Sequence, residues 1–163
     1  MNARDTAPVF TTTERLRQHI ASTVGQRVVL ANGCFDPLHV GHVRYLQDAA
    51  RHGDFLVVAM NDDAGTRALK GAGRPVIPEA DRAAIVAALD MVGAVLLFSE
   101  PDVVGILHEL KPAVHAKGTD YTVETVPERE IAIELGIETV ITGDPKSHAS
   151  SAIVKQVRQN DRS

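Results

Sequence analysis

The sequence predicts a doubly wound α/β domain, with a parallel sheet of about five strands and helices on both faces. Five short apolar runs, most of them rich in β-branched residues, have the composition of strands; they cover residues 28–31, 55–60, 94–98, 113–116 and 139–142. Amphipathic segments with helical spacing lie between them, at residues 43–52, 80–89, 102–110 and 127–135. Because strands and helices alternate, we expect a parallel sheet that binds ligands beyond the carboxyl ends of its strands, where the strand order reverses.

The two ends of the chain carry weaker signals. Residues 1–10 show no periodicity and are expected to be disordered or extended, which leaves residues 11–163 as a single domain. Thr11 and Glu14 have the spacing of a capping box, so we expect a first helix to begin there. A final helix is expected over residues 152–158.

Composition argues against several classes of protein. The formal charge of -4 disfavours broad affinity for nucleic acid and favours a small ligand. The single cysteine, Cys34, cannot support an internal disulfide framework, and the N-terminus lacks the features of a signal peptide, so a cytoplasmic location is expected. The most apolar stretch, residues 83–98, is interrupted by Asp90 and Gly93 and is shorter than the ~18 residues of a membrane span. We therefore expect no contact with nucleic acid or membrane.

Residues 28–42 combine a strand, a loop and the start of a helix, where a ligand is expected. A helix N-terminus presents unpaired backbone N–H groups and a partial positive charge, which favour phosphate. Gly41 leaves room for close approach, and His39 and His42, three residues apart, can direct ring N–H groups toward a triphosphate. Alternatively, one histidine caps the helix and the other packs into the core. Two polar rings beside a glycine, directly after a buried strand, would pack poorly into a core. We therefore favour phosphate binding over this alternative.

A metal centre is another alternative for the same segment. Cys34, Asp36, His39 and His42 are all possible zinc ligands. The single cysteine and the position of the histidines at a helix start argue against zinc, and Cys34 is better explained as a small apolar wall residue. We therefore expect no metal held by protein side chains. The chain also lacks a complete Gly-x-Gly-x-x-Gly motif and a P-loop, which disfavours dehydrogenases and P-loop enzymes.

The segment around the two histidines resembles a known signature. Asn32-Gly33-Cys34-Phe35-Asp36 followed by His39-Val40-Gly41-His42 is similar to the signature of the cytidylyltransferase-like nucleotidyltransferases. The resemblance implies a Rossmann-like fold in which the histidine pair binds the phosphates of ATP or CTP, usually with Mg²⁺ bound through the triphosphate. It also implies in-line attack by the substrate phosphate on the α-phosphorus, with release of pyrophosphate and no covalent intermediate. Catalysis is then expected at His39 and His42, and nucleotide contacts at Gly33, Cys34, Phe35, Asp36 and Gly41.

Within this superfamily the chain resembles the adenylyltransferases that make ADP-heptose from heptose 1-phosphate. Four later segments follow the order of that branch: Gly53-Asp54, Asn61-Asp62-Asp63, Lys70-Gly71 with Arg74-Pro75, and Lys117-Gly118-Thr119-Asp120-Tyr121. The resemblance implies transfer of AMP from ATP, preferred over CTP, to D-glycero-β-D-manno-heptose 1-phosphate, in a homodimer. Glycerol-3-phosphate cytidylyltransferase, or a related CTP- or ATP-dependent transferase, is an alternative. A nucleotide-binding regulator without catalytic activity is an alternative from another class.

Two cations after the second strand are candidate substrate contacts. Lys70 lies in a glycine-bearing loop where a flexible ammonium could align the incoming phosphate, and a solvated surface lysine is the alternative. Arg82 begins the following helix, where a cation opposes the helix dipole, so a phosphate or carboxylate partner would explain it. We expect Lys70 to be catalytic and both residues to bind substrate.

The loop after the fourth strand is a candidate wall of the nucleotide pocket. Its expected nucleotide contacts are Lys117, Gly118, Asp120 and Tyr121. Thr119 replaces a glycine that is common in the heptose enzymes, which leaves the conformation of this loop open. His108 and His115, on a helix and within a strand, are interpreted as structural.

The loop after the fifth strand is a second candidate phosphate site because it opens the final helix. The residues expected to hold the β- and γ-phosphates are Lys146, His148, Ser150 and Ser151. Simple N-capping by either serine is the alternative. Ala149 stands where the family usually carries the first hydroxyl of a Ser-Thr-Thr run, which predicts a reduced affinity for triphosphate.

Overall fold

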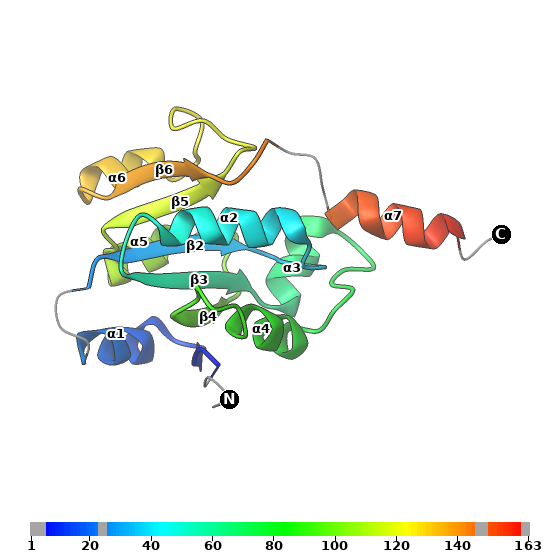
Figure 1. Ribbon diagram of the computed structural model, residues 1–163, viewed down its shortest axis with the longest axis horizontal. Helices are drawn as coiled ribbons and strands as arrows, with labels where there is room; N and C mark the ends of the chain where they lie inside the picture. The colour runs from blue at the N-terminus through cyan, green and yellow to red at the C-terminus, as the bar shows by residue number, and fades with distance from the viewer. Residues whose placement is uncertain (1–5, 23–25, 146–149, 161–163) are drawn as a thin grey trace.

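The computed structural model describes residues 6–22, 26–145 and 150–160 and is built on a six-stranded sheet (Figure 1). The strands are β1 (Val9–Phe10), β2 (Val28–Gly33), β3 (Phe55–Asn61), β4 (Ala94–Phe98), β5 (Val114–Gly118) and β6 (Glu138–Thr142). The helices are α1 (Thr13–Ala21), α2 (Val40–Ala50), α3 (Asp63–Lys70), α4 (Glu79–Ala87), α5 (Val104–Leu110), α6 (Arg129–Glu134) and α7 (Ser150–Asn160). All neighbouring strands are parallel, in the order β1-β4-β3-β2-β5-β6, which confirms the predicted fold class.

Helices cover both faces of the sheet because side chains alternate along its buried strands. In β2, Val29 and Ala31 pack into a cluster that includes residues of α2 and α4. Val28 and Leu30 point the other way and pack into a second cluster with residues of α1, α5 and α6. From β2 the chain proceeds to β3 and β4 on one side, whereas β5 and β6 lie on the other. The strand order therefore reverses between β2 and β5.

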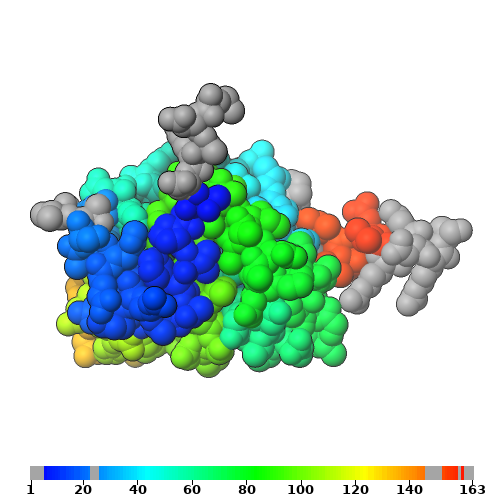
Figure 2. All heavy atoms as spheres, turned by 90° about the horizontal axis from the view of Figure 1, so that it is seen from below, coloured from blue at the N-terminus to red at the C-terminus, as the bar shows by residue number. Residues whose placement is uncertain are grey.

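The N-terminal segment adds an edge strand that the sequence pattern did not signal. Val9 and Phe10 pair with Val95 and Leu96 of β4, so these two residues follow the extended alternative predicted for residues 1–10. Figure 2 shows this blue segment lying against the green segment that contains α4 and β4. The cap of α1 also differs from the prediction, because the side chain of Thr12, and not Thr11, accepts from a backbone N–H of the first turn.

The region between β3 and α4 departs from the prediction more strongly. We expected Lys70 in a loop, but residues 63–70 form α3 and Lys70 ends it. The side chain of Asp62 caps this helix by accepting from the N–H of Gly65 at 2.7 Å, and Gly71 ends it with a φ of 92°.

The other predicted elements correspond to those observed within a few residues. The five predicted strands are β2 to β6, and four predicted helices are α2, α4, α5 and α6. Among the described residues, no helix combines the length and apolar character needed to span a membrane.

Candidate active site

The ladders of β2 and β5 part at their carboxyl ends, and the region between the loops that follow these two strands is called the crevice below. The β2–β3 ladder continues to Gly33 and the β5–β6 ladder to Gly118. The β2–β5 ladder, by contrast, ends where Ala31 pairs with Ala116. Because the strand order reverses here, this is the position at which open α/β sheets bind ligands. The loops that follow β2 and β5 carry the two motifs that the sequence singled out.

The turn after β2 folds back so that the Phe35 ring supports the histidine pair. Phe35 is buried and has a φ of 51°, a left-handed conformation that is uncommon for a large side chain. Its ring lies edge-on to the ring of His42, with the centroids 5.1 Å apart. A Cβ at Gly33 would lie 3.2 Å from the same phenylalanine ring, so a glycine fits here. Gly33 and Phe35, predicted to contact nucleotide, thus shape the turn that presents the histidines.

His39 and His42 both cap α2 through one ring nitrogen. Nδ1 of His39 accepts from the Gly41 N–H at 3.1 Å, and Nδ1 of His42 accepts from the His39 N–H at 3.3 Å. A neutral imidazole whose Nδ1 accepts a hydrogen bond carries its proton on Nε2. The rings stack, with their centroids 3.9 Å apart. Capping and phosphate binding, which the sequence presented as alternatives, are therefore compatible, because they use different nitrogens.

The charge state of His42 follows from its surroundings. Burial lowers the pKa of His42 to about 4, and electrostatic interactions with His39 and Lys70 act in the same direction. His42 is therefore neutral near pH 7 and can donate from Nε2. Lys70 is exposed at the end of α3, and its charge is near enough to influence His42. His39 and His42 are in direct contact, and the catalytic role of Lys70 stays a prediction.

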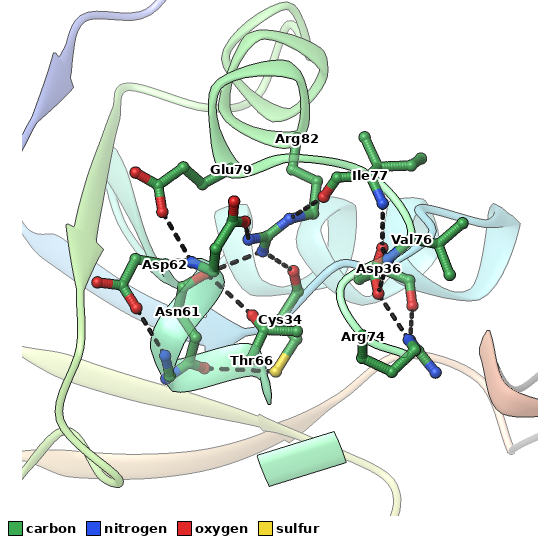
Figure 3. Close-up of polar contacts among 12 residues, drawn as sticks. Cys34, Asp36, Asn61, Asp62, Thr66, Arg74, Val76, Ile77, Glu79 and Arg82 are labelled. Atoms are coloured by element: carbon green, nitrogen blue, oxygen red, sulfur yellow. Dashed lines mark hydrogen bonds and ion pairs between the residues drawn. The ribbon is translucent and has the colours of Figure 1, made fainter. Parts of the chain in front are cut away.

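Asp36 has an internal role in place of its predicted nucleotide contact. Its carboxylate is buried and accepts from Nε of Arg74 at 2.7 Å and from the N–H groups of Val76 and Ile77 at 2.9 Å (Figure 3). Burial alone would raise the pKa of Asp36, but these hydrogen bonds and the Arg74 charge outweigh it and lower the pKa. The carboxylate therefore ties the turn after β2 to the segment before α4.

Arg82 is also internal, which corrects the prediction that it binds substrate. Its fully buried guanidinium donates to the carbonyls of Ile77, Cys34 and Asn61 at 2.6–2.8 Å. It also forms a 2.8 Å ion pair with Asp63, so the expected carboxylate partner comes from the protein itself (Figure 3). These contacts join the turn after β2, the end of β3 and the start of α3. Arg82 thereby fixes the histidine segment relative to the helix that carries Lys70.

Cys34 and Asn61 lie side by side beneath the crevice. Sγ of Cys34 is 3.6 Å from Oδ1 of Asn61, whose amide nitrogen donates to the Glu100 carbonyl. Two of the four residues weighed as zinc ligands, Cys34 and Asp36, therefore have other partners. Among the described residues, no group of three or more histidine, cysteine, aspartate or glutamate side chains could hold a metal ion.

The β5 side of the crevice is built around a buried ion pair. Nζ of Lys117 lies 3.3 Å from Oε2 of Glu128, close enough for an ion pair although the hydrogen-bond geometry is not met. The same Nζ lies 5.0 Å from the centroid of the Tyr121 ring. A Cβ at Gly118 would meet no atom within 4 Å, so the backbone is open to approach there. Glu128 was missed in the sequence because it lies outside the recognised motif, just before α6.

The β5 loop is tied to the loop after β6. Thr119 donates from its hydroxyl to the Asp144 carbonyl at 2.8 Å, which gives the threonine that replaces the common glycine a clear role. Asp144 also pairs with Arg44 of α2 at 3.0 Å. Asp120 and Tyr121 are exposed at the rim. The predicted phosphate contacts Lys146 and His148 lie outside the described residues, as do the side chains of Ser150 and Ser151.

A separate cavity of about 460 Å³ lies at the carboxyl ends of β1 and β4. Five carboxylates line it: Asp62, Glu79, Glu100, Asp102 and Glu109. Their negative field opposes binding of a triphosphate or a sugar phosphate. This cavity therefore fits a phosphate ligand less well than the region between β2 and β5.

Comparison with known proteins identifies the family of the chain. A family model described as Cytidylyltransferase-like matches residues 30–157. The chain is 49% identical over 138 residues to the "Bifunctional protein HldE" of Geotalea uraniireducens, and 48% identical over 125 residues to that of Geobacter metallireducens. These matches cover 83% and 76% of this chain but only 28% and 26% of the relatives. The chain thus spans about a quarter of the length of the curated relatives it matches.

Solved structures share the fold. A lipopolysaccharide core biosynthesis protein from Thermoplasma volcanium superposes with a TM-score of 0.63 at 28% identity, covering 75% of this chain and all of that one. Pantothenate synthetase from Thermus thermophilus superposes with a TM-score of 0.64 over 94% of this chain and 70% of that one, at 16% identity. The second likeness concerns the fold alone.

Proposed function

The chain belongs to the cytidylyltransferase-like family, and we propose that it transfers AMP from ATP to D-glycero-β-D-manno-heptose 1-phosphate, forming ADP-heptose and pyrophosphate. The observation that carries the proposal is the histidine pair at the start of α2. Both Nδ1 atoms accept backbone hydrogen bonds, which places the ring protons on Nε2 beside a helix N-terminus. These Nε2–H donors are suited to the negatively charged oxygens of a triphosphate.

The reaction needs positioning more than it needs a nucleophilic side chain. A phosphate oxygen of the acceptor attacks the α-phosphorus of ATP while the bond to the β-phosphate oxygen breaks, and pyrophosphate leaves on the opposite side. His39 and His42 stabilise the charge that develops on the departing pyrophosphate. Lys70, at the end of α3, aligns the attacking phosphate and offsets its charge. No proton has to be transferred for the bonds to balance.

Magnesium is proposed as the metal of the reaction, bound through the triphosphate. It would neutralise phosphate charge and orient the leaving group. The donor set at the crevice fits this mode, because it offers imidazole Nε2–H groups and an ammonium, which would contact phosphate oxygens. Asp36, the nearest motif carboxylate, already pairs with Arg74.

The choice of heptose 1-phosphate and ATP rests on likeness to relatives. The HldE matches cover most of this chain and include the order of motifs that resembles the heptose branch. A homodimer and a cytoplasmic location, where ATP is available, are proposed on the same basis. The alternative from another class is a regulator that binds the nucleotide but does not turn it over.

A substrate panel tests the proposal. Pyrophosphate release would be measured with Mg²⁺ for ATP and CTP, each crossed with heptose 1-phosphate and glycerol 3-phosphate. We expect the fastest release from ATP with heptose 1-phosphate. Preference for CTP with glycerol 3-phosphate would overturn the assigned branch. Tight ATP binding without turnover of any pair would favour the regulator.

A further inference from the structure

Two side chains bridge β2 and β5 where the ladder between them ends. On the α2 side, the Tyr45 hydroxyl donates to the Ala116 carbonyl at 2.8 Å and accepts from the Asn32 N–H at 3.3 Å. On the opposite side, Nε2 of His115 lies 3.1 Å from Oδ1 of Asn32. Asn32 is therefore held from both faces of the sheet, at the point where the crevice opens.

His115 is a neutral donor in this arrangement. The residue is fully buried, and burial, with a smaller effect of the Lys117 charge, lowers the pKa of His115 to about 3. Because Oδ1 of Asn32 can only accept, the proton of the neutral ring lies on Nε2. Nδ1 is then a buried acceptor that has no hydrogen-bond partner among the described residues. A buried strand position would normally carry an apolar residue, so the orphaned nitrogen calls for an explanation.

The hydrogen bond fixes which way the Asn32 amide points. An amide carries its acceptor and its donors on opposite sides, and the two orientations have nearly the same shape. With Oδ1 held by His115, Nδ2 is left as the donor for another partner. Asn32 is half-buried, whereas the preceding residues of β2, 28–31, are buried. Nδ2 is thus the donor that this partly exposed side chain can offer to a ligand at the end of β2.

We propose that Asn32 donates a hydrogen bond from Nδ2 to an oxygen of the bound nucleoside triphosphate, and that His115 is the positioning residue that holds the amide in the donating orientation. The inference rests on the proposed function. Asn32 lies between the turn that leads to the histidine pair and the open backbone at Gly118, so a nucleotide spanning the crevice passes over it. An uncharged N–H donor suits a ribose or phosphate oxygen.

Calorimetric titration of Mg²⁺–ATP into purified variants tests the contact. Asn32→Asp keeps the shape and the His115 acceptor but replaces the donor with an anionic oxygen, so ATP affinity should fall more than tenfold. Asn32→Ala, which serves if the aspartate variant does not fold, should bind several-fold more weakly than the wild type. Thermal unfolding of each variant checks the fold.

The positioning role requires a double-mutant cycle. His115→Leu should weaken ATP binding several-fold in the wild type but cause no further loss in the Asn32→Ala background. His115→Gln, whose amide nitrogen can take the place of Nε2, should restore most of the affinity. His108→Leu, at an exposed position of α5, is the matched control and should bind like the wild type.

Three outcomes would count against the inference. If both Asn32 variants bind ATP as tightly as the wild type, Asn32 does not contact the nucleotide. An equal loss from His115→Leu in both backgrounds would make His115 a structural residue only. If the wild type binds no ATP, the proposed function itself is wrong and the inference falls with it, which separates the two failures.

Discussion

Two regions beside the crevice use their polar residues in opposite ways. At the start of α2, His39 and His42 satisfy the backbone with one ring nitrogen and carry the ring proton on the other. Between α3 and α4, the guanidinium of Arg82 has protein partners on three separate segments and no exposure. Both regions carry residues that the sequence singled out as candidate site residues, but the histidines leave a ring N–H for a ligand, whereas the Arg82 guanidinium is buried against protein groups. Burial thus distinguishes a candidate ligand contact from an internal support.

The largest effect is expected from breaking the internal support. Arg82→Leu leaves the Asp63 carboxylate and three carbonyls without their partner, so the free energy of unfolding should fall by about 3–5 kcal/mol, the scale for breaking up a charged network around a buried side chain. Urea unfolding would measure the loss. Arg51→Leu, an arginine exposed at the end of α2, is the matched control. A change below about 1 kcal/mol, typical of a surface pair, would contradict the support role.

The next effect concerns the histidine pair and falls mainly on turnover, with a smaller loss of stability from the missing helix cap. His42→Ala should lower turnover by about 100- to 1000-fold, the scale for losing one preorganised donor, and His39→Ala should have a smaller effect. Steady-state kinetics and circular dichroism would be recorded together, with His108→Ala as the control. Near-normal turnover by both folded histidine variants would remove their assigned role.

Lys70 should show a narrower effect because its proposed role is to align the acceptor phosphate. Lys70→Ala is expected to impair use of the phosphorylated substrate by roughly 10- to 100-fold, the value of one hydrogen bond to a charged group, while ATP affinity changes little. Kinetics and calorimetry separate these quantities, and Arg67→Ala, exposed on the same helix, is the control. If use of the phosphorylated substrate and affinity for ATP fall equally, Lys70 contacts the triphosphate instead.

The smallest effect is a pH dependence of stability from His115. The folded protein keeps this ring neutral down to a pKa of about 3, whereas the unfolded chain protonates near the ordinary 6.5. The unfolded state binds more protons between these values, so stability falls as the pH falls through this window, by up to about 1.4 kcal/mol per pH unit. His115→Gln should reduce that slope, as measured by urea unfolding at pH 6.5 and pH 5. An unchanged slope would contradict the buried neutral state.

The sequence predicted those features that depend on neighbouring residues. His39 and His42 are three residues apart at a helix start, so their convergence follows from helix geometry. The partners of Arg82 could not be predicted in the same way, because Cys34 is 48 residues away and Asn61 is 21 residues away. The Asn32–His115 pair spans 83 residues and forms only once β2 and β5 are neighbours.

The missed helix α3 has a local explanation. Gly65 and Thr66 are weak helix formers in the middle of an eight-residue helix, so the sequence favoured a loop. A Cβ at Gly65 would lie 3.2 Å from both Asp62 Oδ1 and the Ser99 carbonyl, so the glycine allows the helix to pack closely against the end of β4. Tertiary packing thus outweighed helix propensity, and it placed Lys70 at the end of a helix.

The contrast between presented and internal groups can be tested by nitrogen NMR of the side chains with and without Mg²⁺–ATP at pH 7. We predict a neutral His42 with its proton on Nε2, and a shift of that nitrogen when ATP binds, while the Arg82 guanidinium signals stay in place. An unresponsive His42 together with shifted Arg82 signals would contradict the account, because ATP would then contact the side that the structure assigns to internal support.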